Sequence, residues 1–183
     1  MRVSIEYYSN QSLYESRAMS DISHIIVSID KQRLYCIGHQ GNILIEYPVS
    51  TSIYGVGNQN GSFKTPLGEH SIAQKIGAGC TINEVFVGRQ AKGVLQALKL
   101  ANIPLPDDII TSRILWLKGE ETGLNKGDGI DSYQRYIYIH GTSEEDKIGT
   151  PASHGCVRMR NKDVIELFDL VDEGCKVLIR EKI

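Results

Sequence analysis

The chain has 183 residues, with 20 Lys and Arg against 22 Asp and Glu, so its formal net charge at pH 7 is −2. This length suffices for one domain with a complete hydrophobic core, and we expect residues 1–183 to form a single domain. The small net charge and the pI of about 6.2 give no broad positive surface, so neither nucleic acid nor a membrane is an expected partner.

The N-terminal sequence MRVSIEYYSNQSLYES has no basic start, continuous apolar segment or small-residue cleavage site of the kind that marks a signal peptide. No apolar run in the chain approaches the roughly 18 residues needed to cross a bilayer. We therefore expect a cytoplasmic protein, or a periplasmic one if an unrecognised route exports it.

Strands are expected throughout the first half of the chain. β-branched and aromatic residues gather there in short runs separated by turn-forming residues, a pattern typical of strands. The runs lie at 23–30, 33–37, 42–50, 69–77 and 84–88. The first three follow one another closely and predict a β-meander. The segment 51–68 is dense in Gly, Asn, Ser and Pro and predicts a long loop.

A helix is expected over residues 89–100, where Val94, Leu95 and Leu98 recur at helical spacing. The prolines of IPLPDD end it, because proline cannot continue the helical hydrogen bonds. Two further strands are predicted at 112–119 and 135–141, with a glycine-rich loop between them.

A second helix is predicted over residues 161–174. Asn161 is its expected N-cap, and Gly174 is its expected left-handed stop. Apolar residues recur along one face of this segment, and the strand 175–180 closes the chain. The pattern as a whole predicts a mainly β fold with some α (α+β), in which one or two helices pack on sheets.

The four cysteines form no CxxC pair, and without a secretory signal we interpret them as reduced thiols. Cys36 and Cys175 lie in strand-like apolar runs and are expected to be small core residues. Cys80 lies in a glycine-rich loop and is assigned no role. Cys156 remains as the candidate for chemistry.

Several features near Cys156 fit a catalytic thiol. His140 ends a predicted strand, and the chain from there to Cys156 is long enough to return alongside it. Gly155 lets the backbone approach a substrate carbonyl closely. The following residues enter a predicted helix start, where free N–H groups favour negative charge. Arg158 could pair with a substrate carboxylate.

Two other interpretations fit the same residues. His140, His154 and Cys156 could bind zinc, but the spacing is tight and no second thiol pair completes a structural site. Arg158 could instead be an ordinary solvated surface charge. We favour catalysis over zinc binding, and expect neither a metal nor a cofactor.

The segments IHGT and GTPASHGCVRM, followed by Asn161, Asp163 and Val164, resemble the signature of the L,D-transpeptidase (YkuD-type) catalytic domain family. The stretch KTPLGEHSI at 64–72 is similar to that family's Thr-Pro-x-Gly turn and the strand after it. The resemblance covers about residues 23–180. It implies a β-sandwich-like sheet core with a packed helix.

The resemblance also implies roles for individual residues. Cys156 is the expected nucleophile and His140 the expected base, oriented by the backbone carbonyl of Gly141. His154 is expected to shape the site. Backbone amides around Gly155 and Cys156 are expected to form the oxyanion hole.

Ser153 and Arg158 match the motif as well, and are expected to contact the substrate's stem peptide. The stretch Gly88–Ile110 is longer than a minimal version of the domain needs. It could be a lid, a specificity element or an elaboration.

The implied reaction is attack on the amide between an L-configured centre of diaminopimelate and the terminal D-alanine of a peptidoglycan tetrapeptide. Cys156 would form a thioester, which water, a free D-amino acid or an amine of a second stem would resolve. Since we expect a cytoplasmic protein, we favour an L,D-carboxypeptidase that acts on soluble muropeptides in murein recycling.

An L,D-transpeptidase that forms 3–3 cross-links is the alternative. A non-catalytic muropeptide-binding module is a second one, although a pure binder has no use for a base beside a thiol. Carbapenems are expected to acylate Cys156.

Overall fold

The computed structural model describes residues 21–183. The N-terminal segment without signal-peptide features lies outside these residues. The prediction of one domain over 1–183 extends beyond them and stays a prediction. Within the described part of the chain, no helix is both long and apolar enough to cross a membrane.

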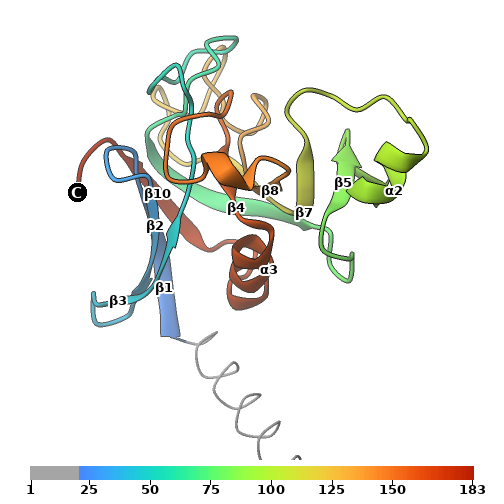
Figure 1. Cartoon of the computed structure of the whole chain (residues 1–183). Coiled ribbons are helices and arrows are strands. Elements are labelled where there is room, and N and C mark those ends of the chain that lie inside the picture. The colour runs from blue at the N-terminus through green and yellow to red at the C-terminus, as the bar shows by residue number, and fades with distance from the viewer. Residues whose placement is uncertain (1–20) are drawn as a thin grey trace, which may run out of the picture.

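The described residues form one curled sheet of ten strands (Figure 1). The strands are β1 (Ile22–Ser28), β2 (Arg33–Gly38), β3 (Ile43–Pro48), β4 (Gly68–Ile76), β5 (Glu84–Val87), β6 (Gln90–Val94), β7 (Ile110–Gly119), β8 (Tyr138–Thr142), β9 (Val157–Met159) and β10 (Lys176–Arg180). Their order is β3-β2-β1-β10-β4-β7-β5-β6, while β8 pairs with β7 and β9 pairs with β8. The predicted mainly β fold and its opening meander are confirmed.

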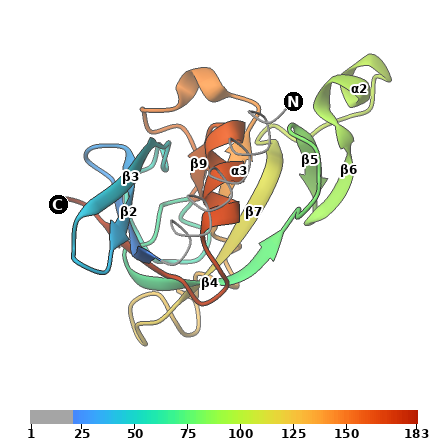
Figure 2. The same cartoon turned by 90° about the horizontal axis from the view of Figure 1, so that it is seen from below.

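The C-terminal strand β10 lies between β1 and β4 in the sheet; it is parallel to β1 and antiparallel to β4. Helix α3 (Asn161–Leu170) packs within the curl of the sheet (Figure 2). Val164, Leu167 and Phe168 of this helix are buried among strand residues in the main core. This apolar face therefore holds α3 beside β7 and β8, the strands that carry the candidate site.

The predicted helix over 89–100 is only half right. Gly88 and Arg89 both have positive φ, which makes a two-residue hairpin turn between β5 and β6. Helix α2 (Leu95–Leu100) begins only after β6 ends. The hairpin and α2 together form an arm at the edge of the sheet (Figure 2).

Helix α3 ends at Leu170, four residues before the predicted stop. Val171 adopts an extended conformation, is buried, and accepts a hydrogen bond on its carbonyl oxygen from Lys75 Nζ at 2.6 Å. Gly174 does have positive φ, but its amide donates to Ile72 in the turn that leads into β10. Tertiary contacts of Val171 therefore replace the last helical turn.

All four cysteines are free thiols. Cys36 is completely buried in the main core, as predicted, and burial raises its pKa to about 12. Cys175 packs partly buried against the same core. Cys80 lies beside a second, smaller core of Phe86, Ile114, Trp116 and Tyr138, which Cys156 also contacts.

Candidate active site

The short strand β9 brings the candidate nucleophile beside the strand of the candidate base. β9 runs parallel to β8, with Ile139 opposite Val157 and His140 opposite Arg158. Sequence patterns did not predict β9, and it separates Cys156 from α3. The predicted helix start that follows Cys156 therefore comes only after β9, at Asn161.

Cys156 is partly exposed, and the backbone of β8 holds its sulfur. Its Sγ accepts a hydrogen bond from the Tyr138 amide at 3.4 Å and donates one to the Tyr136 carbonyl at 3.4 Å. Burial against apolar groups raises the pKa of this thiol to about 12. The amide of Tyr138 and the positive charges of Arg158 and Arg135 oppose that rise without cancelling it. At neutral pH the resting sulfur is therefore a thiol.

His140 is buried, with 1% of its surface exposed, in the middle of β8. Its Nδ1 lies 2.7 Å from the carbonyl oxygen of Gly141, the partner expected from the resemblance. A carbonyl only accepts hydrogen bonds, so Nδ1 carries the proton and Nε2 keeps its lone pair. Burial lowers the pKa of His140, against the opposing charge of Asp108. The ring is thus a neutral imidazole with a free basic nitrogen.

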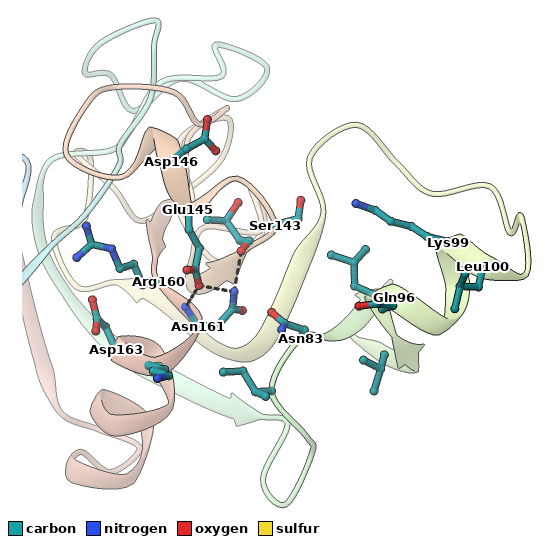
Figure 3. Close-up of a pocket in the computed structure, with 15 residues that line it drawn as sticks. Asn83, Gln96, Lys99, Leu100, Ser143, Glu145, Asp146, Arg160, Asn161 and Asp163 are labelled. Atoms are coloured by element: carbon teal, nitrogen blue, oxygen red, sulfur yellow. Dashed lines mark hydrogen bonds between the residues drawn. The ribbon is translucent and has the colours of Figure 1, made fainter.

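A saturated hydrogen-bond network around Asn161 fixes the backbone next to His140, and Figure 3 shows the part of it that joins Asn161 to Glu145. Asn161 Oδ1 accepts from the hydroxyls of Thr111 and Ser112, each at 2.6 Å. Its Nδ2 donates to the Thr142 carbonyl at 2.9 Å and to Glu145 Oε1 at 2.6 Å. The side chain predicted as a helix cap instead ties β7 to the end of β8, and Arg160 is the N-cap residue of α3.

This network also explains the glycine at position 141. A Cβ there would lie 2.5 Å from the Thr111 carbonyl oxygen and 2.7 Å from Asn161 Oδ1. Only glycine fits this contact, so the sequence His140–Gly141 places the base and its orienting carbonyl without a clash. A cavity of 810 Å³ opens on the other side of Asn161, toward α2, and Cys156 is not among its lining residues.

The nucleophile loop is held by Ser153, which is completely buried. Its hydroxyl donates to the carbonyl of Cys156 at 2.6 Å and accepts from the Gly155 amide at 3.3 Å. Gly155 has φ of +124°, a conformation that side-chain-bearing residues rarely adopt. Ser153 therefore shapes the turn that presents Cys156, and its predicted contact with the stem peptide stays a prediction.

His154 lies at the surface, with 48% of its side chain exposed. Its ring packs near Tyr54 and Phe63, with centroids 5.9 and 6.2 Å away, and both of these aromatic residues are more than half exposed. Tyr54 and Phe63 come from the long loop predicted over 51–68. The three rings form an exposed wall beside the nucleophile loop, and the expected role of His154 in shaping the site stays a prediction.

Arg158 is the largest completely enclosed side chain of the described residues, at 2% exposure. Its Nη1 lies 2.9 Å from Glu144 Oε2, and its Nη2 lies 2.8 Å from Asp108 Oδ1. Two carboxylates neutralise this guanidinium, so it is closed to a carboxylate of the substrate. The structure makes Arg158 a buried anchor, in place of both the predicted substrate contact and the solvated surface charge.

Asp108 is the residue of the site that the sequence did not indicate. It belongs to the connection between α2 and β7, within the stretch Gly88–Ile110. Besides Arg158, it contacts His154, whose Nδ1 lies 3.3 Å from Asp108 Oδ2. Although burial raises the pKa of Asp108, hydrogen bonds from Arg158 and His154 and the nearby positive charges lower it overall. The connection is therefore a wall of the site.

Replacing Asp108 with asparagine should shift the pH dependence of catalysis. The charge of Asp108 raises the pKa of His140, so its loss lowers that pKa further, and the acid limb of kcat/KM moves to lower pH. The unfolding free energy should fall by about 1–3 kcal/mol, because buried Arg158 loses one charged partner. Rate profiles and denaturant titrations measure both effects.

Asp107→Asn is the matched control, since Asp107 is the exposed neighbour on the same connection. It should leave the profile and the stability as they are. An Asp108→Asn enzyme whose acid limb does not move would show that this carboxylate has no influence on the base.

The sequence model of the YkuD L,D-transpeptidase catalytic domain matches residues 22–179. The chain belongs to this family. Membership of this family agrees with the fold described above.

Individual relatives agree. YkuD of Bacillus subtilis is 54% identical over 46 residues, which are 25% of this chain and 28% of YkuD. YcfS of Escherichia coli, named a probable L,D-transpeptidase, is 26% identical over 160 residues, which are 85% of this chain and 43% of YcfS. The chain thus spans less than half the length of these two relatives.

Solved structures share the fold. An L,D-transpeptidase, LdtMt1 in complex with imipenem, aligns with a TM-score of 0.52 at 17% identity, over 87% of this chain and 59% of that one. Bd1075 of Bdellovibrio bacteriovorus aligns with a TM-score of 0.54 at 16% identity, over 89% of this chain and 49% of that one. At these identities the likeness concerns the fold, and it confirms the expected YkuD-like sheet core.

Within the described residues, no group of three or more His, Cys, Asp or Glu side chains is placed to hold a metal ion. The three residues considered for zinc, His140, His154 and Cys156, form no such group.

Proposed function

We propose that this L,D-transpeptidase-family enzyme cleaves the bond between diaminopimelate and the terminal D-alanine of peptidoglycan tetrapeptides through a thioester on Cys156. The observation that carries the proposal is the His140 ring, whose Nδ1–H is fixed on the Gly141 carbonyl, while β9 pairs with β8 and Cys156 directly precedes β9. Family membership supports the choice of substrate.

The resting state is a neutral pair, since burial raises the pKa of the thiol and lowers that of the imidazole. Proton transfer therefore accompanies attack: the Cys156 sulfur leaves the Tyr136 carbonyl and gives its proton to His140 Nε2. The sulfur bonds to the diaminopimelate carbonyl carbon while the carbonyl π pair moves onto oxygen. The backbone around Gly155 and Cys156 is the proposed donor set for that oxyanion.

Collapse of the tetrahedral intermediate breaks the C–N bond. The imidazolium of His140 returns its proton to the departing nitrogen, and D-alanine leaves with a free amine. Water then attacks the thioester, His140 takes a proton from it, and the tripeptide carboxylate and the thiol are restored. We propose hydrolysis as the main outcome, which is supported by the partial solvent exposure of Cys156; transfer to the amine of a second stem gives a 3–3 cross-link.

Products of a defined muropeptide tetrapeptide test the proposal. We expect mass spectrometry to show tripeptide and free D-alanine in equal amounts, with dimers scarce even when an amine acceptor is in excess. Abundant dimers would show that the enzyme is a transpeptidase and not mainly a hydrolase. An unchanged tetrapeptide would refute the proposed acyl-enzyme mechanism. Cell fractionation tests the predicted cytoplasmic location separately.

β-lactam binding follows from the same thiol. The neighbour LdtMt1 was solved with imipenem, and we extend this property to Cys156 of the present chain as part of the proposal. Attack on the strained lactam carbonyl opens the ring and leaves a thioester, with the proton passing from sulfur to the lactam nitrogen.

A further inference from the structure

Arg89 occupies the turn between β5 and β6, at the start of the arm that the sequence analysis left without a function. Its guanidinium lies over the rings of Trp116 and Tyr136, with Cζ 4.6 and 5.2 Å from the two centroids. Nη1 also donates a hydrogen bond to the phenolic oxygen of Tyr138 at 3.3 Å. Three contacts therefore position a side chain that is only partly buried.

These contacts place the guanidinium on the side chains of two residues, Tyr136 and Tyr138, whose backbone groups hydrogen-bond to the nucleophile. The carbonyl of Tyr136 accepts the hydrogen bond of the Cys156 thiol, and the amide of Tyr138 donates to the same sulfur. Arg89 thus rests on the side chains of the two residues whose backbone holds Cys156. A substrate bound at the sulfur would have its neighbouring groups within reach of this arginine.

Arg89 differs from Arg158 and Arg135, the two arginines whose charges act on Cys156, in having no strong acceptor. Arg158 is neutralised by two carboxylates. Arg135 donates to the carbonyls of Gly57 and Lys64, which lie in the long loop. Within residues 21–183, Arg89 forms no ion pair with any carboxylate. Its positive charge is therefore available to a ligand.

The backbone at Arg89 gives a second and independent reason to look for a role. Its φ is +67°, in the left-handed region, and it follows Gly88 in a two-residue hairpin turn. Such turns favour Gly or Asn at this position, because a larger residue is strained there. A residue that strains its own turn is a candidate for function.

We propose that Arg89 binds a carboxylate of the stem peptide, and so recognises the substrate in place of the enclosed Arg158. This inference rests on the proposed function. Two carboxylates of a tetrapeptide lie near the scissile bond: the free one of diaminopimelate and the C-terminal one of D-alanine. A planar guanidinium that is already stacked on aromatic rings can offer its outward N–H groups to either.

Steady-state kinetics of Arg89 variants on the tetrapeptide test the inference. Arg89→Gln should raise KM about tenfold or more, with a smaller effect on kcat, because the bond to a non-reacting carboxylate is present in both ground and transition states. Arg89→Lys should recover part of the loss, since a point charge lacks the bidentate fork. Lys92→Gln, which removes a positive charge from the same hairpin, is the matched control and should leave KM unchanged.

Arg89→Gly separates binding from a purely structural role. Glycine adopts the left-handed conformation without strain, so Tm should stay equal or rise while KM rises as in Arg89→Gln. A fall in Tm with an unchanged KM would show that Arg89 only supports the aromatic residues beneath it, and would overturn the inference.

Amidated substrates identify the carboxylate. Amidation of the carboxylate that Arg89 binds should raise the KM of the natural enzyme, and Arg89→Gln should then raise the KM for that amide no further. If amidation and Arg89→Gln raise KM independently for both amides, Arg89 pairs with neither carboxylate.

Binding measured by calorimetry tests the role of Arg89 without relying on turnover, so its outcome is independent of the test of the proposed function. The tetrapeptide should bind Cys156→Ala about tenfold or more tightly than it binds Cys156→Ala/Arg89→Gln. Equal affinities would overturn the role of Arg89 even if D-alanine is released, and a difference would support it even if no D-alanine is released.

Discussion

Replacing Cys156 with alanine should abolish the release of D-alanine while the protein stays folded. The thiol is the only nucleophile in the proposed mechanism, so no slower route through the same site remains. Cys156 is partly exposed at the edge of the smaller core, and loss of its sulfur removes little buried surface. Mass spectrometry of the products and a thermal unfolding curve measure the two effects.

Cys36→Ala is the matched control, because it removes a thiol whose pKa is raised to the same value of about 12. This side chain is completely buried, so its loss should lower the unfolding free energy by about 1 kcal/mol and leave the activity of the folded protein intact. Imipenem should add one mass increment to the Cys36→Ala protein and none to Cys156→Ala. Substantial D-alanine release by Cys156→Ala would disprove the mechanism.

The sequence predicts those strands whose own residues have a strong preference for the strand conformation. The meander β1–β3 and the closing strand β10 carry runs of β-branched and aromatic residues between turn signals. His140 and Cys156 were predicted as partners, from the motif and from the length of chain between them. Strand propensity and a local motif were sufficient for this part.

The remaining parts depend on contacts across the fold. Strand β9 has three residues and exists because β8 offers a free edge. Asp108 is 46 residues before His154 in the chain, and no spacing pattern predicts their contact. Asn161 has the residue type of a helix cap, yet two hydroxyls from β7 and a carbonyl from β8 use its side chain instead.

The burial of Arg158 also depends on contacts across the fold. Arginine is usually exposed or paired with a ligand, and the sequence is compatible with both. Burial of Arg158 requires two carboxylates, and these come from the connection after α2 and the turn after β8. The Gly88–Ile110 stretch thus supplies the acid that neutralises Arg158 and also supplies Arg89 at its other end.

Replacing His140 with glutamine should reduce kcat/KM by roughly 10²-fold or more, the usual scale for loss of a positioned base. Glutamine can still donate to the Gly141 carbonyl, so the variant tests the base rather than the fold. The Cys156 thiol is still present in this variant, but no base remains to accept its proton. Activity on the tetrapeptide and a thermal unfolding curve give the comparison.

The pH profile assigns the role to one histidine. Burial lowers the pKa of His140, so its neutral, basic form persists below the ordinary value of about 6.5. In the natural enzyme, kcat/KM should fall only as the pH drops through that lowered pKa, because protonation then removes the base. The acid limb should vanish in His140→Gln and remain in His154→Gln, whose exposed ring only shapes the site. A limb that is lost in His154→Gln and kept in His140→Gln would exchange the two roles.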